Sequence, residues 1–496
     1  MLGQWRQGIL YPRWASLAHF GYGEPRFVFY PPASWTLGAA LSAILPWTIV
    51  PSVFIWIALV AAGISMFVLV RQWLARRDAI FAAVFYAVNP YHLVIVYWRS
   101  ALAELLASCL LPLLVMFVLR LGKDRRAMVG ASLVLSASWL INAPAAVMIH
   151  YSFALLVAVI ACVRRAPRIL LTGVASLILG AALAAFYLVP AIYEQRWAEI
   201  AQAVSAGSRP LDNFLFIHTT DVDHDAFNRL ISWLAVTMIF LTVLSAWTAR
   251  RWRERDREIW CGLLVWAGAC SALMFSVTAP AWNLLPKLEF MQFPWRWMLC
   301  LSVVFTLLVA FGIRRWAVRG VVYTVTLCVI VLCWHRVQAP WWDNAADLRE
   351  MEDNVATGAG YEGTDEYAPK GSDPTQVDKD ARKVTVEGAA RGAIRVFAWR
   401  PEAKVFTADM SAADNLALRL FNYPAWRVEV NGRVVEAGRR ESTGQMLVPV
   451  EAGANRVEIT FIRTWDRTAG GVVSVVAWLG LLLGFFMSSS AFARSA

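Results

Sequence analysis

The sequence predicts a polytopic α-helical membrane protein of about eleven spans with a C-terminal extracytoplasmic β-sandwich domain. Hydrophobic residues make up 59% of the 496 residues and charged residues only 16%, with a mean hydropathy of +0.52. This composition lies outside the usual range of soluble domains. Long apolar segments recur along the chain with basic residues in the loops between them, and a polar block near the C-terminus shows a period of two.

The predicted spans are the segments that are apolar and long enough to cross roughly 30 Å of hydrocarbon as helices. The fourth and fifth are short and are separated only by the sequence LINAP. The spans are 52–70, 79–95, 100–119, 127–141, 145–163, 169–190, 228–248, 259–277, 296–313, 320–335 and 469–487.

Basic residues fall in alternate loops, as expected if those loops share the cytoplasmic side of a cytoplasmic (inner) membrane. The remaining connections, including 191–227, 278–295 and the polar block 336–468, are then external. The basic loops contain Arg71, Arg76 and Arg77; Arg120, Lys123, Arg125 and Arg126; Arg164, Arg165 and Arg168; Arg250, Arg251, Arg253, Arg255 and Arg257; and Arg314, Arg315 and Arg319.

The segment 33–47 is apolar but short, and a crossing there would reverse the side of every basic loop. Trp35 and Trp47 flank it, so we expect a helix lying at the outer interface. The first fifty residues are then external, and we expect an upstream helix that this sequence lacks. The predicted parts are 1–51, an external loop with an interfacial helix; 52–335, the multi-span domain; 336–468, an extracytoplasmic linker and β-sandwich; and 469–496, a last span with a short cytoplasmic tail.

The polar block begins with 341–376, which is acidic and rich in Gly, Pro and Asp, so it predicts a loop or linker. Period-two segments follow: KVTVEG, AIRVFAW, LALRLF, WRVEVNGRVVEA and NRVEITFI. They are broken by turn residues, including the hairpin signal Asn431-Gly432. We expect a sandwich of about 85 residues. Because it carries no catalytic triad and no metal-ligand spacing, the pattern favours a binding or packing module.

Several functional classes are excluded. The formal charge of +11 and the pI near 9.5 do not indicate nucleic-acid binding, because the basic residues lie in short loops rather than on one face. The seven cysteines show no CxxC spacing, and we interpret them as small apolar side chains in helix contacts. No GxGxxG, Walker A, HExxH or GxSxG motif is present, which argues against a nucleotide-driven pump or a soluble-type hydrolase.

The external N-terminal stretch places Arg13, His19, Glu24 and Arg26 among aromatic residues. This mixture suits a site for an anionic, partly apolar ligand, because arginine takes a phosphate bidentately while rings cover a sugar or prenyl face. The alternative is an interfacial aromatic belt with arginines that extend to the headgroups.

The segment 89–107 contains His92, Arg99 and an intramembrane Glu104. A charged group within a span marks a functional site by default. The five-residue separation of Arg99 and Glu104 is too wide for an ideal helical pair, so we expect both to face one ligand; the alternative is a structural bond between Glu104 and Arg99 or a neighbouring helix. Arg296 begins another span at the outer side, so Arg26, Arg99 and Arg296 could converge.

The loop HTTDVDHD at 218–225 contains His218, Asp221, Asp223, His224 and Asp225. Its spacing matches no established metal motif, and a solvated acidic loop is the simpler interpretation. No cofactor is certain from the sequence. The alternative is a divalent cation that bridges this loop to a phosphate.

Four segments carry a resemblance to a known family: 10–32, 89–107, GYEGTDEYAP at 360–369 and MQFPWRW at 291–297. They resemble bacterial multi-spanning membrane proteins described as related to 6-pyruvoyl-tetrahydropterin synthase. Nothing in the sequence indicates pterin chemistry, because it contains neither a His-rich zinc triad nor a compact soluble α+β domain. The layout resembles the GT-C superfamily of integral membrane glycosyltransferases, with a long first external loop, a proline-initiated interfacial helix, many spans and a C-terminal external domain.

The GT-C resemblance implies transfer of a sugar from a polyprenyl-phosphate carrier to a glycan or protein acceptor on the outer face. It makes Glu24 and Glu104 the candidate catalytic residues, with Arg13, His19, Arg26, His92, Arg99 and Arg296 as candidate substrate-binding residues. Such enzymes usually carry an Asp soon after their first span. This sequence departs from that pattern, and Glu24 is the one acidic residue in its first loop.

Two other functions stay open. One is a transporter or flippase for a lipid-linked glycan, although no internal repeat is evident. The other is a non-catalytic envelope assembly protein whose β domain does the binding. The lipid bilayer is a partner in each case, and nucleic acid in none.

Overall fold

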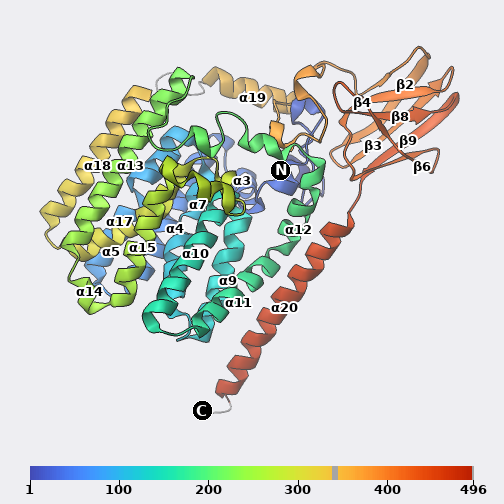
Figure 1. Cartoon of the computed structure of the whole chain (residues 1–496). Helices are drawn as coiled ribbons and strands as arrows, with labels where there is room; N and C mark the ends of the chain where they lie inside the picture. Colours follow the sequence, from blue (N-terminus) through green and yellow to red (C-terminus); the bar gives the residue numbers. More distant parts are fainter. Residues whose placement is uncertain (338–344, 494–496) are drawn as a thin grey trace. The chain divides into compact units, whose positions relative to one another are not determined.

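The computed structural model describes residues 1–337 and 345–493 (Figure 1). The chain forms two compact units. We call the first the β unit; it consists of Met1–Tyr30, Phe186–Ala203 and Asp343–Val472. The second, the helical unit, consists of Pro31–Ala185, Val204–Trp342 and Val473–Ala496. The first 30 residues therefore belong with the β domain, whereas the predicted interfacial helix belongs with the spans.

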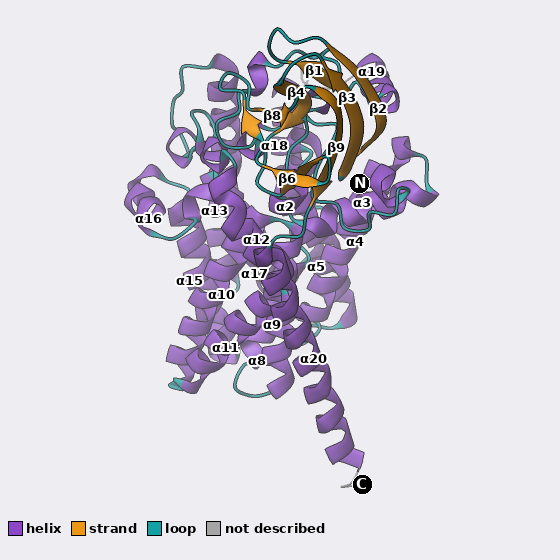
Figure 2. Cartoon of the chain, turned by 90° about the vertical axis from the view of Figure 1, so that its right-hand side faces the viewer, coloured by secondary structure: helices purple, strands orange, loops and turns teal. Residues whose placement is uncertain are grey.

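The helical unit contains most of the α-helices. Helices α8, α9, α10 and α11 lie beside one another (Figure 2). Its helices are α3 (Pro32–Ile44), α4 (Val50–Val70), α5 (Arg76–Ala87), α6 (Pro90–Val94), α7 (Leu102–Ala107), α8 (Leu110–Arg120), α9 (Arg125–Ile141), α10 (Ala143–Arg164), α11 (Arg168–Leu183), α13 (Val222–Thr248), α14 (Trp252–Arg255), α15 (Arg257–Leu273), α16 (Ala279–Leu284), α17 (Met298–Gly312) and α18 (Trp316–Val337).

Helix α17 is at the centre of this unit, since every residue from Met298 to Phe311 is buried. A helix that is apolar all round is stable only when other elements or lipid surround it. Other helices instead expose large apolar side chains: Leu171 is 71% exposed, Ile178 66%, Phe240 64% and Trp247 63%. Such outward apolar faces suit contact with hydrocarbon rather than water.

Each of the eleven predicted spans overlaps one α-helix or two consecutive α-helices. Within the described residues, seven helices are long and apolar enough to cross a membrane, or up to nine if each of two bent pairs is one span. The bent pairs are Arg168–Leu183 with Ala185–Trp197 and Arg257–Leu273 with Ser276–Leu284. The predicted spans 127–141 and 320–335 fall on shorter apolar helices, so the count of eleven stays a prediction.

Asparagine and proline separate helices at the predicted boundaries. The Asn142 side chain accepts a hydrogen bond from the backbone N–H of Ala145 at 2.9 Å and thereby caps α10, which starts with Pro144 in its first turn. This cap explains why the sequence LINAP divides α9 from α10. The predicted helix at 33–47 is α3, which begins at Pro32 and ends before Pro46.

The β unit contains two antiparallel sheets within the described residues, coloured orange in Figure 2. One has the strand order β1-β4-β8-β7 and the other β2-β3-β9-β5-β6. The strands are β1 (Val384–Val386), β2 (Gly392–Arg400), β3 (Ala403–Met410), β4 (Asp414–Phe421), β5 (Trp426–Val430), β6 (Arg433–Val435), β7 (Gly438–Arg439), β8 (Gln445–Val450) and β9 (Gly453–Phe461). The helices of this unit are α1 (Leu2–Trp5), α2 (Arg26–Phe29), α12 (Ala185–Tyr193), α19 (Ala345–Thr357) and the start of α20 (Trp465–Ala493).

Both sheets contribute to one apolar core, with Phe406 of β3, Leu418 of β4, Val448 of β8 and Ile459 of β9 all fully buried. Each predicted period-two segment forms a strand, and the predicted Asn431-Gly432 turn joins β5 to β6, where both residues have positive φ. Strands β3 and β8 were not predicted. In β3 the buried Lys404 occupies an inward position and hides the alternation.

The prediction of loop or linker for 341–376 is wrong for α19. Gly and Pro are common in that segment only after residue 357, so its first part can form a helix with an acidic first turn. Leu348, Met351 and Val355 recur at helical spacing on α19. Residues 341–344 lie outside the described residues.

The N-terminal residues pack into the β-unit core. Trp14 is fully buried and its ring lies 5.3 Å from that of Trp426 and 5.7 Å from that of Tyr423. Tyr22 donates to the Asp378 carbonyl at 3.0 Å, and its own carbonyl accepts from the Phe421 N–H. The aromatic residues of the first loop thus serve largely as core.

Replacing Gly23 by Ala is expected to destabilise the β unit strongly. Gly23 has φ +77°, and a Cβ there would lie 2.1 Å from Nε1 of Trp14. Left-handed strain costs about 1–2 kcal/mol, and the clash with a buried ring adds about 1–3 kcal/mol. Thermal unfolding of the full chain measures the loss. Gly8→Ala is the control, because Gly8 has φ +85° with nothing within 4 Å. Equal losses in both variants would contradict the packing role of Trp14.

The buried Lys404 is expected to make the stability of the β unit depend on pH. It is 2% exposed, donates to the carbonyls of Arg400 and Pro401 at 2.8 Å each, and lies 4.2 Å from the Trp426 ring centroid. Burial lowers its pKa from 10.5 to about 7. Between these values the unfolded chain binds more protons than the folded chain, so this group makes stability rise with pH across that window. Below about pH 7 Lys404 is charged in the folded and the unfolded chain, so its full desolvation penalty lowers the stability of the folded state.

Lys404→Met removes this titration. As the pH rises from 6 to 9, the β unit of the variant is therefore expected to gain less protection from hydrogen exchange than that of the wild type. Hydrogen exchange in peptides that cover β3 and β9 measures the difference, with both proteins compared at each pH. Lys383→Met, at an exposed lysine beside β1, serves as control. The same pH response in wild type and Lys404→Met would refute the assignment.

Candidate functional site

The Glu104 cluster consists of Glu104, Arg99, Arg296 and Tyr91 and lies within the helical unit. Tyr91 is on α6, which begins after the sharp break at Asn89-Pro90, where the Asn89 side chain accepts from the N–H groups of Tyr91 and His92. The chain then winds as a π-helix from Ile95 to Arg99 and breaks at Ser100, which has φ +48°. Glu104 follows in the first turn of α7.

Glu104 is 1% exposed and receives three polar side chains. Tyr91 Oη donates to Oε1 at 2.8 Å, and Arg99 Nη1 donates to Oε2 at 2.7 Å. Arg296 Nε lies 3.4 Å from the same Oε2. A carboxylate so deep in an apolar unit is stable only with such charged partners.

The expectation that Arg99 and Glu104 face a ligand rather than each other is wrong for this structure, since they form a direct ion pair. The sequence argument assumed a regular helix with 3.6 residues per turn. The π-helix and the left-handed Ser100 change that geometry and bring side chains five residues apart together. This is the structural alternative stated above.

Arg296 reaches Glu104 because the segment before α17 turns sharply. Gln292 has φ +64°, and Pro294 starts a short 3-10 turn, Pro294–Trp297, that leads into the helix. Arg296 Nη1 donates to the Met291 carbonyl at 2.5 Å. The guanidinium is therefore fixed by backbone as well as by the carboxylate.

Aromatic rings surround both guanidiniums of the Glu104 cluster. Phe293 and Trp295 stack with centroids 5.0 Å apart, Arg99 Cζ lies 4.9 Å from the Trp295 centroid, and Arg296 Cζ lies 4.7 Å from that of Phe293. Each such contact contributes roughly 0.5–2 kcal/mol, toward the upper end when the cation is desolvated. The indole N–H groups of Trp98 and Trp295 are buried and make no hydrogen bond within the described residues. Cations, rings and N–H donors together can bind an anion with an apolar attachment.

His92, another predicted site residue, lies fully buried beside this cluster. Its Nδ1 is 3.0 Å from the Ala87 carbonyl, and its ring meets that of Tyr86 at 5.0 Å. These contacts serve packing around the helix break. A role in substrate binding stays a prediction.

A second cluster, the Glu24 cluster, lies in the β unit and consists of Glu24, His19, Arg26 and Thr364. Glu24 is fully buried. Its Oε1 accepts from Arg26 Nε, and its Oε2 lies 2.8 Å from His19 Nε2 and accepts from the Thr364 N–H at 3.0 Å. Arg26 Nη2 also donates to Thr364 Oγ1 at 2.5 Å.

The segment GYEGTDEYAP shapes this second cluster. A Cβ on Gly363 would lie 2.2 Å from Nε2 of His19, so only glycine permits the close approach. Arg26 Cζ lies 5.7 Å from the Tyr361 ring centroid. Burial raises the pKa of Tyr361, against the lowering effect of Arg26. The loop residues His19, Glu24 and Arg26 thus lie together in one cluster, and a role for it in ligand binding stays a prediction.

Arg13 is separate from the Glu24 cluster in its described contacts. Its guanidinium carbon lies 4.1 Å from the Tyr11 ring centroid, and it lines a cavity of the β unit. Of the three arginines predicted to converge, Arg99 and Arg296 meet at Glu104. Arg26 belongs to the other unit, and its convergence with them stays a prediction.

The loop 218–225 does not form the metal site that its composition allowed. His218 Nδ1 lies 3.1 Å from Asp225, and Asp221 caps α13 by accepting from the N–H groups of Asp223 and His224. His224 Nε2 contacts Asn213 at 2.9 Å. In the part of the chain that the structure describes, no three His, Cys, Asp or Glu side chains are grouped to hold a metal ion.

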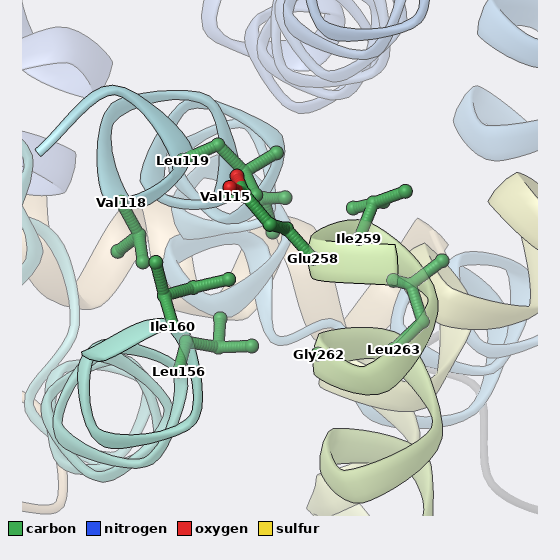
Figure 3. Close-up of a pocket in the computed structure, with 9 residues that line it drawn as sticks. All are labelled: Val115, Val118, Leu119, Leu156, Ile160, Glu258, Ile259, Gly262 and Leu263. Atoms are coloured by element: carbon green, nitrogen blue, oxygen red, sulfur yellow. The ribbon is translucent and has the colours of Figure 1, made fainter. Parts of the chain in front are cut away.

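An apolar cavity between α8, α10 and α15 also contains a carboxylate (Figure 3). It measures about 10 Å³, and Glu258 lies at its edge beside Leu119 and Val115. Arg164 donates to Glu258 at 2.5 Å and Lys123 at 3.2 Å. The space is about one water molecule in size, and the carboxylate is paired. We therefore interpret this cavity as a packing gap between helices and not as a ligand site.

Apolar helices of spanning length and a C-terminal two-sheet region define the class of this chain as a multi-pass membrane protein. Residues 27–339 match the family described as "6-pyruvoyl-tetrahydropterin synthase related domain; membrane protein". The match covers well over half of the chain and ends before β1, so the chain belongs to this family. No curated protein and no solved structure matches it.

Several residues of the two clusters were not singled out from the sequence. Tyr91 belongs to the Glu104 cluster, Phe293 and Trp295 contact its guanidiniums, and Thr364 belongs to the Glu24 cluster. All four lie within the short segments that carried the family resemblance. Their presence in those segments could have identified them as candidates, but their contacts depend on turns that only the structure shows.

Glu104→Gln is expected to destabilise the helical unit, because Arg99 and Arg296 lose their shared carboxylate. Removing one member of a buried ion pair typically costs about 3–5 kcal/mol. The double variant Arg99→Gln with Glu104→Gln should recover part of the loss, because one buried cation leaves with the anion. Unfolding midpoints of the full chain in one detergent measure both. A single variant as stable as wild type, or a double variant no better than the single, would contradict the pairing.

Proposed function

We propose that this protein is a membrane glycosyltransferase of the GT-C type. It moves a sugar from a polyprenyl-phosphate carrier to a glycan or protein acceptor on the outer face of the cytoplasmic membrane. In this proposal eleven spans cross the membrane and the β unit faces outward, as the alternating basic loops favour. The polyprenyl chain is a lipid, which suits the apolar outer surfaces of the helical unit.

The observation that supports the proposal best is the meeting of two guanidiniums from separate spans at one buried carboxylate. Arg99 and Arg296 both contact Oε2 of Glu104. Guanidiniums bind phosphate oxygens through two parallel hydrogen bonds, and the Phe293 and Trp295 rings offer the surface for a prenyl chain. In a unit of apolar helices, the natural ligand for such a group is an anionic lipid headgroup.

The proposed reaction is a substitution at the anomeric carbon of the donor sugar. An acceptor hydroxyl oxygen attacks this carbon, and the bond from the carbon to the phosphate oxygen breaks. The polyprenyl phosphate leaves with the bonding electron pair, and the acceptor proton passes to a base. Arg99 and Arg296 stabilise the negative charge that grows on the leaving phosphate.

The two candidate carboxylates have different proposed roles. Glu104 accepts from Arg99 and Tyr91 and contacts Arg296, so its proposed role is to position the arginines. Glu24, which lies 2.8 Å from His19, is the proposed proton acceptor. A carboxylate beside a histidine is an arrangement that many enzymes use for proton transfer.

Proteoliposomes that contain the full chain test the proposal, with a labelled polyprenyl-phosphate hexose as donor and an envelope glycan fraction as acceptor. Label should move from lipid to acceptor with release of polyprenyl phosphate. Arg99→Gln and Arg296→Gln should each lower the rate by about 10²-fold, the usual loss when one transition-state donor is removed. Glu24→Gln should also abolish transfer.

Arg229→Gln is the control, because Arg229 is 61% exposed and pairs with Asp225 at the surface. Wild-type transfer that the arginine variants leave unchanged would overturn the assignment of the site. Movement of the lipid-linked sugar across the bilayer without transfer would favour a flippase. Neither activity would favour a non-catalytic assembly protein.

A further inference from the structure

The β unit contains a cavity of about 360 Å³ to which the reaction proposed above assigns no role. It is lined by the N-terminal stretch, by strand residues and by the first turns of α20. Tyr11, Arg13, Glu402, Arg463 and Arg467 supply its polar wall. The volume is large enough for a phosphate group with a short attachment.

The lining of this cavity is predominantly cationic. Three guanidiniums, from Arg13, Arg463 and Arg467, face one carboxylate, from Glu402. Arg467 is bound on its other side by Glu194, which accepts from it at 2.7 and 2.8 Å. Asp466, next to Arg467, is buried and is not part of the lining. After the Arg467–Glu194 pair is set aside, two cations and one anion remain to meet a ligand.

Two hydrogen-bond donors of the lining are buried without a partner. Arg13 Nη1 and Tyr11 Oη both lack a hydrogen bond within the described residues, although the Arg13 guanidinium stacks on the Tyr11 ring at 4.1 Å. Buried donors without an acceptor are unfavourable unless a ligand supplies one. Because the two side chains stack on each other and both line the cavity, we expect one ligand group to reach both donors.

The remaining wall of the cavity is apolar. Phe186 and Phe461 line it, and the Tyr11 and Phe186 rings meet edge to face with centroids 5.9 Å apart. Burial raises the pKa of Glu402, against the lowering by the backbone N–H and the guanidinium of Arg13. A carboxyl that protonates more readily repels a bound anion less.

We propose that this cavity binds a phosphate ester that carries an apolar substituent. Arg13 Nη1 and Tyr11 Oη donate to the phosphate oxygens, and the exposed Arg463 closes over them from the solvent side. Phe186 and Phe461 contact the substituent. The phosphate can belong to a lipid headgroup or to a free phosphorylated molecule, since both present the same oxygens.

This site is independent of the glycosyltransferase proposal. Its residues share none with the Glu104 cluster. Binding in the cavity should therefore persist in the Arg99→Gln variant, so failure of one proposal leaves the other standing.

Calorimetric titration of the full chain in detergent tests the proposal with three probes: inorganic phosphate, geranyl phosphate and geraniol. Geranyl phosphate is expected to bind saturably and geraniol not to bind. Tighter binding of geranyl phosphate than of inorganic phosphate would identify a lipid-linked source, and equal binding would identify the free phosphate group as sufficient.

Three variants locate the binding. Arg13→Gln and Tyr11→Phe each remove one donor and should weaken geranyl phosphate about tenfold. Gly471→Leu fills the cavity while every charge stays, because a Cβ at Gly471 already lies 2.9 Å from Arg463 Nη2. It provides the test should Arg13→Gln fail to fold. The control Arg456→Gln alters an arginine that is 62% exposed on β9 and lies outside the cavity.

The proposal is supported if the three cavity variants weaken binding and the control does not. No saturable binding of either phosphate probe would overturn it. Binding that Arg13→Gln, Tyr11→Phe and Gly471→Leu all leave at the wild-type affinity would overturn it as well.

Discussion

A carboxylate buried among apolar helices must have cationic partners, and the structure around Glu104 follows from that constraint. Isolated burial of such a charge is prohibitively unfavourable. Arg99 and Arg296 meet this need from two spans that are far apart in the sequence. Three local features are needed to bring both arginines to the carboxylate: the helix break at Asn89-Pro90, the π-helix before Ser100 and the turn before α17.

The same principle operates in the β unit with different elements. Glu24 and Glu194 are both fully buried, and each is held by an arginine and by a second donor. Glu24 joins the N-terminal loop to the segment around Thr364, and Glu194 joins the turn that follows α12 to the start of α20. Buried ion pairs thus connect distant segments in both units. We infer that these pairs serve chiefly to fix which segments meet, because the desolvation of the charges offsets much of the attraction between them.

The sequence predicted the elements whose signal is local. The apolar segments lie on helices, and the Asn431-Gly432 hairpin joins β5 to β6, because composition and turn chemistry act over a few residues. Strand β3 was missed because Lys404, a charged residue at an inward position, interrupts its alternation. Helix α19 was missed because Gly and Pro were assumed to be spread over the whole of 341–376. Arg99 and Glu104 were singled out, but their pairing was given only as the alternative, since a π-helix leaves no periodic signature. The contacts of Tyr91, Trp295 and Thr364 are long-range and could not be predicted from spacing.

A cryo-electron microscopy structure of the full chain with a short-chain polyprenyl-phosphate sugar tests the central claim most directly. The account predicts phosphate density within hydrogen-bond distance of both Arg99 and Arg296, with the prenyl chain against Phe293 or Trp295. Phosphate found only in the β-unit cavity, or an unchanged Glu104 cluster with no ligand beside it at saturating concentration, would contradict the account.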